Sequence, residues 1–385
     1  MRDKEKGQRE EEKRRRPKWP VYILILTLVL GVVVFAAYRD GTGFDVLRRY
    51  FQYGKAEEAT GILEYEYDTS SEQRFAMLGN HLVVLSKTSL SVLDGQGGEV
   101  FSTGVKMEYP ALHATGGRAV CYDVGGTELY VVDEQGKVWE HTVEETEPII
   151  SARLNGAGWL TVTAGLKNHK GGVWVYNADM EEHFLFRSSR RFVSDAYVTD
   201  DCKRLAAVTM GQEGGVFVSD LVFYNLNEKE PFATCAITDG LVTAMGQDGD
   251  LVAVCDTCLA FVSPRGELTA TYDYGGAYLR EYTTGGDDFT ALLLNRYTSG
   301  SVGRLVTVGG NGEEVGSLDI HEEVLHISAA GRYLAVLYAD RLVVYNSDLR
   351  PYATLNGTDY ARSVLMRSDG SAILLGSETA KLFLP

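Results

Sequence analysis

The sequence predicts an all-β protein, an eight-bladed β-propeller, and three features of the chain support this fold class: a repeat, a set of turns and two complementary chain ends. Seven short apolar stretches end in Asp, Asn, Ser or Gly before a turn, at separations of 37–48 residues. A unit of about 40 residues with four strand-like runs is typical of a propeller blade, because such a small sheet buries its faces only against neighbouring blades. The stretches end at Asp94, Asp133, Asn177, Asn225, Ser263, Gly309 and Asn346.

The turns between the first two strands of each repeat indicate the number of blades. Glycine, asparagine and aspartate suit these reversals, since hairpin turns need positive φ or local side-chain hydrogen bonds. Comparable turns occur at residues 79–80, 116–117, 156–158, 200–201, 248–249, 285–286, 330–331 and 369–370. These eight turns predict eight blades. Seven blades would follow if one repeat were misread, and the sequence leaves this alternative open.

The two ends of the repeat region are complementary. The last repeat has three strand-like runs and reaches Pro385 without a fourth. The segment from Gly61 to Tyr67 alternates apolar and polar residues and precedes the first full repeat. We therefore expect it to supply the missing strand, because pairing the N- and C-terminal strands in one blade closes the ring and removes exposed strand edges.

Ahead of the repeats lies a candidate membrane anchor. The uncharged run from Val21 to Ala37 extends for 17 residues. At about 1.5 Å per residue, it is long enough to cross most of a bilayer core of about 30 Å. Residues 19–38 are thus predicted to form one transmembrane helix that precedes the propeller. A cleaved signal peptide is the competing interpretation of this run.

The charges around this run predict its orientation and the remaining regions. Nine basic residues precede it, and four occur in the twenty residues after it. The positive-inside rule makes residues 1–18 a cytoplasmic tail and places the rest outside the cytoplasm. Residues 39–59 are expected to form a juxtamembrane helix or stalk, and residues 60–385 form the propeller. The predicted location is the cell membrane, as a single-pass protein with an extracytoplasmic propeller.

The charge of the predicted propeller bears on its partners. The whole chain has a formal net charge of −16, and residues 59–385 alone carry about −20. A negative field of this size repels phosphate backbones, which argues against nucleic acid as a partner. We expect the membrane to be contacted through the N-terminal helix, and a protein or an anionic envelope polymer to be bound by the propeller.

From residue 61 onward the repeats resemble WD40-type and quinoprotein-type propeller blades, and the segment from Asp133 to Trp139 is similar to the strand-end turn of the latter. No repeat ends in the Trp-Asp pair of WD40 proteins. Together with the basic N-terminus and the anchor, the whole chain resembles an uncharacterised family of membrane-anchored propellers from Gram-positive gut bacteria. The resemblance implies a fold and a cell-surface setting.

No catalytic set, metal site or cofactor is predicted. Cys255 and Cys258 have a spacing seen in metal and redox sites, but we place them on a hairpin, where a zinc site would need two further ligands. A local disulfide and two ordinary half-buried thiols both remain open. The seven histidines form no metalloprotease arrangement, and no phosphate-binding or nucleophile-elbow motif is present.

Loop length is the clearest functional signal. The second and third strands of three repeats are joined by longer connections, at residues 165–171, 211–215 and 295–303. In propellers these connections share a face with those between blades, where ligands usually dock. The residues predicted to form one basic binding cluster on this face are Lys167, His169, Lys170, Arg187, Arg190, Arg191 and Arg296. Such a cluster suits an anionic partner; the competing interpretation is a set of solvated charges on variable loops.

The sequence therefore favours a non-catalytic function. We expect a membrane-anchored extracytoplasmic propeller that binds or scaffolds a component of the cell envelope. The alternative is a glycan-acting hydrolase or lyase with carboxylates at the propeller mouth. Two convergent carboxylates, one with a raised pKa, would favour the enzyme.

Overall fold

The computed structural model describes residues 19–39, 45, 49, 60–67, 73–115, 117–237, 240–248 and 250–385. The chain divides into two compact units, Met1–Gly54 and Lys55–Pro385. The predicted cytoplasmic tail and most of the predicted stalk lie outside the described residues.

The first unit contains helix α1 (Trp19–Arg39). Its 21 residues match the position of the helix predicted from the sequence. Within the described part of the chain, no helix combines the length and the apolar character needed to cross a membrane. The structure therefore supports a helix at this position and does not support its predicted transmembrane character.

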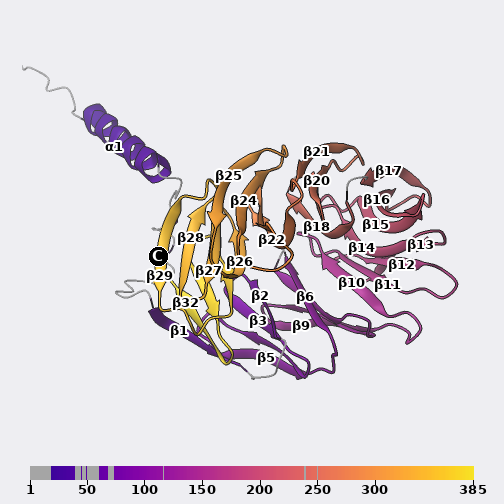
Figure 1. Ribbon diagram of the computed structural model, residues 1–385. Coiled ribbons are helices and arrows are strands. Elements are labelled where there is room, and N and C mark those ends of the chain that lie inside the picture. Colours follow the sequence, from indigo (N-terminus) through magenta and orange to yellow (C-terminus); the bar gives the residue numbers. More distant parts are fainter. Residues whose placement is uncertain are drawn as a thin grey trace, which may run out of the picture. The chain divides into compact units, whose positions relative to one another are not determined.

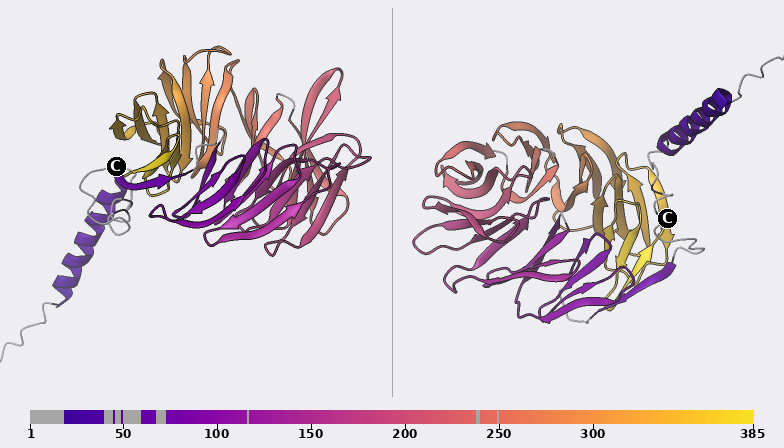
Figure 2. Two further views of the ribbon diagram at one scale, coloured as in Figure 1. Left: turned by 90° about the horizontal axis from the view of Figure 1, so that it is seen from below. Right: turned by 180° about the vertical axis from the view of Figure 1, so that it is seen from behind.

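The second unit is built of eight antiparallel four-stranded sheets, which follow one another in chain order (Figures 1 and 2). The predicted all-β fold with eight blades is confirmed, and the seven-bladed alternative is wrong. In each blade the first strand is the inner one, and the inner strands of successive blades contact each other.

Blades 1 to 4 each take four consecutive strands. Blade 1 comprises β2 (Arg74–Leu78), β3 (His81–Leu85), β4 (Ser89–Leu93) and β5 (Glu99–Gly104), and blade 2 comprises β6 (Pro110–Thr115), β7 (Arg118–Asp123), β8 (Glu128–Asp133) and β9 (Gly136–Thr142). Blade 3 comprises β10 (Ile149–Leu154), β11 (Leu160–Ala164), β12 (Gly171–Tyr176) and β13 (Glu182–Ser188), and blade 4 comprises β14 (Phe192–Val198), β15 (Arg204–Glu213), β16 (Val216–Asn225) and β17 (Pro231–Ile237).

Blades 5 to 7 repeat this arrangement, and blade 8 draws on both chain ends. Blade 5 comprises β18 (Val242–Asp248), β19 (Asp250–Cys255), β20 (Cys258–Val262) and β21 (Leu268–Asp273), and blade 6 comprises β22 (Tyr278–Gly286), β23 (Phe289–Asn295), β24 (Gly303–Gly309) and β25 (Glu314–Ile320). Blade 7 comprises β26 (Val324–Ala330), β27 (Tyr333–Tyr338), β28 (Arg341–Asn346) and β29 (Pro351–Asn356), and blade 8 comprises β30 (Ser363–Met366), β31 (Ala372–Leu375), β32 (Thr379–Phe383) and β1 (Thr60–Glu66).

The ring closes as the complementary chain ends predict. Strand β1 pairs antiparallel with β32, and Thr60 lies opposite Phe383. The hydroxyl of Tyr67 donates a hydrogen bond to the carbonyl of Gly376, at 2.9 Å. A strand from the N-terminal end of the propeller thus covers the edge that the C-terminal strands would otherwise expose.

The alternation of side chains explains which strands lie inside. The middle strands β11, β20, β23 and β31 are buried at nearly every position and consist almost wholly of apolar and small residues. The outer strands β5, β21 and β25 alternate between exposed and half-buried residues. This is the pattern expected when a sheet packs between two neighbours and its outer edge faces water.

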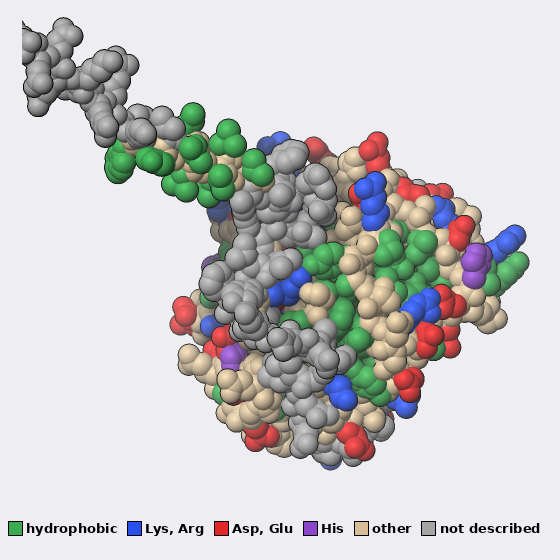
Figure 3. All heavy atoms as spheres, turned by 90° about the vertical axis from the view of Figure 1, so that its left-hand side faces the viewer, with side chains coloured by type: hydrophobic (Ala, Val, Ile, Leu, Met, Phe, Trp, Pro, Cys, Tyr) green, Lys and Arg blue, Asp and Glu red, His purple; other side chains and the backbone are tan. Residues whose placement is uncertain are grey.

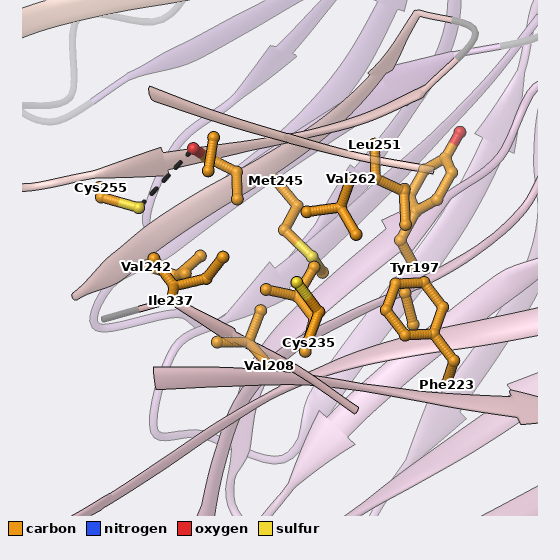
Figure 4. Close-up of a cluster of buried hydrophobic side chains, with 14 of the residues drawn as sticks. Tyr197, Val208, Phe223, Cys235, Ile237, Val242, Met245, Leu251, Cys255 and Val262 are labelled. Atoms are coloured by element: carbon orange, nitrogen blue, oxygen red, sulfur yellow. Dashed lines mark hydrogen bonds between the residues drawn. The ribbon is translucent and has the colours of Figure 1, made fainter. Parts of the chain in front are cut away.

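Adjacent blades bury a shared apolar core. Between blades 4 and 5, for example, Phe223 and Leu221 pack with Val262 and two cysteines, Cys235 and Cys255 (Figure 4). Each cluster joins strands of neighbouring blades, as expected for repeats that bury their faces against one another.

Two faces of the propeller are distinguished below. The turn face carries the connections between the first and second strands, which contact one another from blade to blade: Asn155 bonds the carbonyl of Thr199, Asp287 bonds that of Gly331, and Arg367 bonds the side chain of Asn80. The loop face lies at the other end of the strands and carries the second-to-third-strand connections. Because Thr60 pairs with the end of β32, the chain enters the propeller at the turn face.

Candidate functional site

Six of the seven predicted binding residues come from neighbouring segments of blades 3 and 4 on the loop face. The start of β12 pairs with the end of β13, so that Gly172 lies opposite Arg187. The amide of Lys170 donates to the carbonyl of Ser188 at 2.7 Å, and the hydroxyl of Ser188 donates to the carbonyl of Arg191 at 2.6 Å. These bonds hold the connection 165–170 against the link between the two blades.

Four of these residues are exposed cations. Among the described residues, no carboxylate lies within ion-pair distance of any of them; the four, here called the basic patch, are Lys167, Lys170, Arg187 and Arg190. The ammonium of Lys170 lies 4.7 Å from the ring centre of Phe192, a cation–π contact. His169 is half-buried, and its Nδ1 lies 3.0 Å from the carbonyl oxygen of Lys167. The basic patch therefore has charge available for a partner.

Arg191 has a different role from its neighbours. Its guanidinium contacts the carboxylates of Glu213 and Asp220, the latter at 3.0 Å. Burial raises the pKa of Asp220, and the positive charge of Arg191 partly opposes this effect. Arg191 is thus neutralised within the protein and ties the link between blades 3 and 4 to the hairpin of β15 and β16.

Arg296 is separated in the fold from the other predicted residues. It lies three blades further on, at the end of β23, and lines a pocket of about 530 Å³ between blades 5 and 6 together with Tyr272, Arg304 and His321. Arg304 is bound to Glu314 at 3.1 Å, and the guanidinium of Arg296 lies 5.7 Å from the ring centre of Tyr297. The structure therefore gives no single cluster of seven residues.

The prediction that residues 211–215 form an inserted loop is wrong. Strand β15 continues to Glu213, β16 begins at Val216, and Gly214 and Gly215 form the turn with φ of +57° and +90°. Positive φ at both turn positions is the geometry of a tight hairpin whose twist matches that of its strands. The extra residues therefore lengthen a hairpin.

This hairpin presents residues that the sequence interpretation missed. Val216 and Phe217 are each 67 % exposed, and Phe192 at the start of the neighbouring strand is 58 % exposed. Two large apolar residues directly after a glycine turn were the available signal, since turn-flanking positions are usually polar. Elsewhere, on the face drawn in Figure 3, acidic, basic and hydrophobic side chains are intermixed.

The inner strands hold a second polar cluster, around Arg153. Its Nε donates to the carboxylate of Asp195 at 2.6 Å, and its Nη1 donates to the carbonyl of Met245 at 2.9 Å. The hydroxyl of Ser151 also donates to Asp195, at 2.8 Å. Burial is the largest influence and acts to lower the pKa of Arg153, but the charge and hydrogen bond of Asp195, together with Tyr122 and Tyr282, hold this pKa above its ordinary value. One guanidinium thus links blades 3, 4 and 5.

Further inner-strand side chains accept backbone hydrogen bonds from the next blade. Nδ1 of His113 accepts from the amide of Leu154 at 3.3 Å, and burial, with the nearby charge of Arg153, lowers the pKa of His113 to about 3. The carboxylate of Glu281 accepts from the amide of Ile327 at 3.2 Å and lies 3.4 Å from Nε2 of His326. Burial raises the pKa of Glu281 to about 7. These groups connect the inner strands.

The cysteine hairpin is as predicted, with Asp256 and Thr257 as the turn between β19 and β20. The two cysteines are buried and form no disulfide, and a hydrogen bond with Cys258, together with burial, raises the pKa of Cys255. In the part of the chain that the structure describes, no three His, Cys, Asp or Glu side chains gather in a way that would hold a metal ion.

Comparison with protein families matches residues 52–352 to a family of unknown function, DUF5711. The chain belongs to the DUF5711 family. The matched residues cover most of the propeller, so the part of this DUF5711 chain that defines its family is the repeat region. Comparison with curated proteins finds no match.

Solved structures similar to this DUF5711 protein are propellers. The C-terminal WD40 domain of Sif2 is 14 % identical, with a TM-score of 0.57, over 85 % of this chain and 99 % of that domain. Apo AztD from Citrobacter koseri is 10 % identical, with a TM-score of 0.54, over 78 % and 90 % of the two chains. At this identity the likeness shows the fold alone. The predicted resemblance to WD40-like propellers is confirmed at that level.

Proposed function

We propose that this protein is a membrane-anchored extracytoplasmic module that binds or scaffolds an anionic component of the cell envelope and does not catalyse a reaction. The observation that carries the binding proposal is the basic patch on the loop face. Its four cations have no carboxylate partner among the described residues, whereas Arg191, next to Arg190 in the chain, forms ion pairs with Glu213 and Asp220. Unpaired, exposed cations are free to form charge-assisted hydrogen bonds with a partner.

Binding is tested with the propeller unit, residues 55–385, which contains every strand of the eight sheets. It is used to capture partners from solubilised membranes and cell wall across a range of salt concentrations. We expect capture to weaken as salt rises, because exposed charge pairs are screened, and to be lost in the double variant Arg187→Glu/Arg190→Glu. Arg191 is left unchanged because it pairs within the protein.

The chain offers a matched control. Arg265 and Arg350 are exposed and lie in turns on the turn face, so Arg265→Glu/Arg350→Glu makes the same change in charge away from the basic patch. Capture should survive in this control. Equal loss in both double variants, or no loss in either, would contradict the proposed binding face.

The anchor is tested separately. The uncharged run within α1 and the basic residues before it support the proposal. The full chain should remain in the membrane fraction after alkaline extraction, and a chain lacking residues 1–39 should not. Added protease should digest the propeller in intact protoplasts if it is extracytoplasmic. Release of the full chain by alkali would rule out the anchor.

One observation supports the alternative function, a glycan-acting enzyme. The pKa of Glu281 is raised to about 7, as a general acid requires. Glu281 and Asp195 are the two carboxylates on inner strands whose side chains the structure describes, and Asp195 is bound to Arg153. The second free carboxylate of a glycoside hydrolase is therefore not assembled there. Release of sugars from wall glycans that is lost in Glu281→Gln would favour the enzyme.

A further inference from the structure

The hairpin of β15 and β16 extends beyond the sheet that carries it. On one side the neighbouring strand begins at Phe192, opposite Met210; on the other it ends at Ile237, opposite Ser219. Residues 211–218 therefore form a two-stranded projection, here called the hairpin tip. Residues 212–217 are all exposed.

Arg191 connects the hairpin tip to the rest of the loop face. Arg191 binds Glu213 on the tip and Asp220 at its base, so both strands of the hairpin are tied to the link between blades 3 and 4. The turn at Gly214 and Gly215 adopts positive φ at both residues without strain. Ordering of this kind lowers the entropy that a binding segment loses when a partner docks.

The composition of the hairpin tip is that of an interface. Val216 and Phe217 are exposed at its end, and Phe192 is exposed at its base, next to Lys170 of the basic patch. Aromatic residues and arginine are enriched where proteins bury surface against partners. Phe192 and Lys170 are in contact, and Val216 and Phe217, as consecutive residues of β16, place apolar side chains on opposite sides of the hairpin tip.

A sugar or phosphate polymer fits this surface less well, because it would match the cations and leave Val216 and Phe217 in water.

We propose that the hairpin tip and the basic patch together dock a polypeptide partner, through a segment that is net acidic and buries apolar side chains on Phe217, Val216 and Phe192. This inference rests on the proposed function and narrows its partner from an anionic envelope component to a protein. The acidic side chains of the partner meet Arg187, Arg190, Lys167 and Lys170, and its apolar surface covers the tip. The contribution of charge is mainly to association rate and specificity, and the buried aromatic contact sets the lifetime of the complex.

The test places a photo-crosslinking residue, p-benzoylphenylalanine, at Phe217 of the full-length protein in the cells that produce it. The matched control carries the same residue at Val315, which is 42 % exposed and lies near the start of an outer strand, at the turn face. We expect Phe217 to give a protease-sensitive adduct whose cross-linked peptide is net acidic. Val315 should not give this adduct.

A second variant separates this inference from the proposed function. Arg187→Glu/Arg190→Glu should lower the yield of the adduct at Phe217 at least tenfold, while unchanged thermal unfolding shows that the fold is intact. An adduct with lipid or glycan, no adduct at all, or a polypeptide adduct indifferent to the charge reversal would overturn the inference. If the adduct is glycan and depends on the two arginines, the proposed binding function stands without a protein partner. If Arg187→Glu/Arg190→Glu also leaves capture by the propeller unchanged, the inference and the proposed binding function both fail.

Discussion

Arginine occurs in two opposite environments in two regions of this propeller. On the inner strands, Arg153 is 18 % exposed and bound to Asp195, which is 9 % exposed. On the loop face, Arg187 and Arg190 are exposed and have no carboxylate partner in the described structure. The comparison teaches that the surroundings of an arginine, more than its presence, decide whether its charge is used within the protein or is open to a partner.

The physical reason is the cost of desolvation. A guanidinium removed from water needs a carboxylate and further acceptors, because an uncompensated buried charge costs several kcal/mol. Arg153 has these partners in Asp195 and the carbonyl of Met245. A solvated guanidinium needs no internal partner, and its pairing with one contributes little. Four predictions test this contrast, from the largest expected effect to the smallest.

The largest effect is expected for Arg153→Met. The substitution leaves the buried carboxylate of Asp195 without its cation, which should lower the free energy of unfolding by about 3–5 kcal/mol. Urea unfolding of residues 55–385 measures it, with the exposed Arg187→Met as control. Adding Asp195→Asn should restore part of the loss. A loss below about 1 kcal/mol would show that Asp195 is solvated.

The second prediction concerns pH and Glu281. Its folded pKa is raised from 4.5 to about 7, so the carboxyl group contributes stability that is complete below pH 4.5 and is lost as the pH rises through 7. From pH 4.5 to 8, the wild type should lose on the order of 2–3 kcal/mol relative to Glu281→Gln.

The comparison with Glu281→Gln is needed because His326 titrates in the same window in the opposite sense. Burial lowers the pKa of His326, so its contribution to stability falls as the pH decreases. Because Nε2 of His326 lies 3.4 Å from the carboxylate of Glu281, the two titrations are coupled, and the same comparison is repeated with His326→Gln in both proteins. Unfolding curves at several pH values give the difference, and a constant difference would refute the raised pKa of Glu281.

The third prediction concerns hydrogen bonds between blades. Thr283 accepts from the amide of Ala329 at 3.1 Å, and Ser328 accepts from that of Met366 at 2.9 Å. Thr283→Val and Ser328→Ala each leave an amide without its acceptor and should cost about 1–2 kcal/mol by urea unfolding. Ser91→Ala, at a half-buried position on β4 where the hydroxyl makes an exposed hydrogen bond with the hydroxyl of Ser102, is the control. Values equal to the control would mean that water replaces the lost acceptor.

The smallest effect separates two adjacent arginines. Arg191→Gln removes the partner of Glu213 and Asp220 and should lower the free energy of unfolding by up to about 1 kcal/mol, since Glu213 is well exposed and the pair is screened. Arg190→Gln should leave stability unchanged and weaken capture of the partner. Calorimetry and the binding assay together distinguish the two. The reverse result would exchange their assigned roles.

The blade number and the closure could be predicted because they depend on local patterns. Glycine and aspartate at the reversals determine the turns, and the missing fourth strand of the last repeat calls for the segment from Gly61 to Tyr67. The two longer connections at 165–171 and 295–303 also appear as expected. At 211–215 the same reasoning failed, because Gly214 and Gly215 serve equally well as a loop or as a tight hairpin turn.

The sequence alone determined the class of fold, the number of blades and the strand that closes the ring, since turn chemistry and the alternation of apolar residues act over a few residues. The tertiary structure alone decided which charges are free. Seven basic residues look alike in the sequence, but Arg191 meets Glu213 and Asp220 only when the hairpin folds beside it, and Arg296 belongs to another blade. The pairing and exposure of a charged side chain depend on contacts between residues that are distant in the chain. Local sequence patterns do not reveal these contacts.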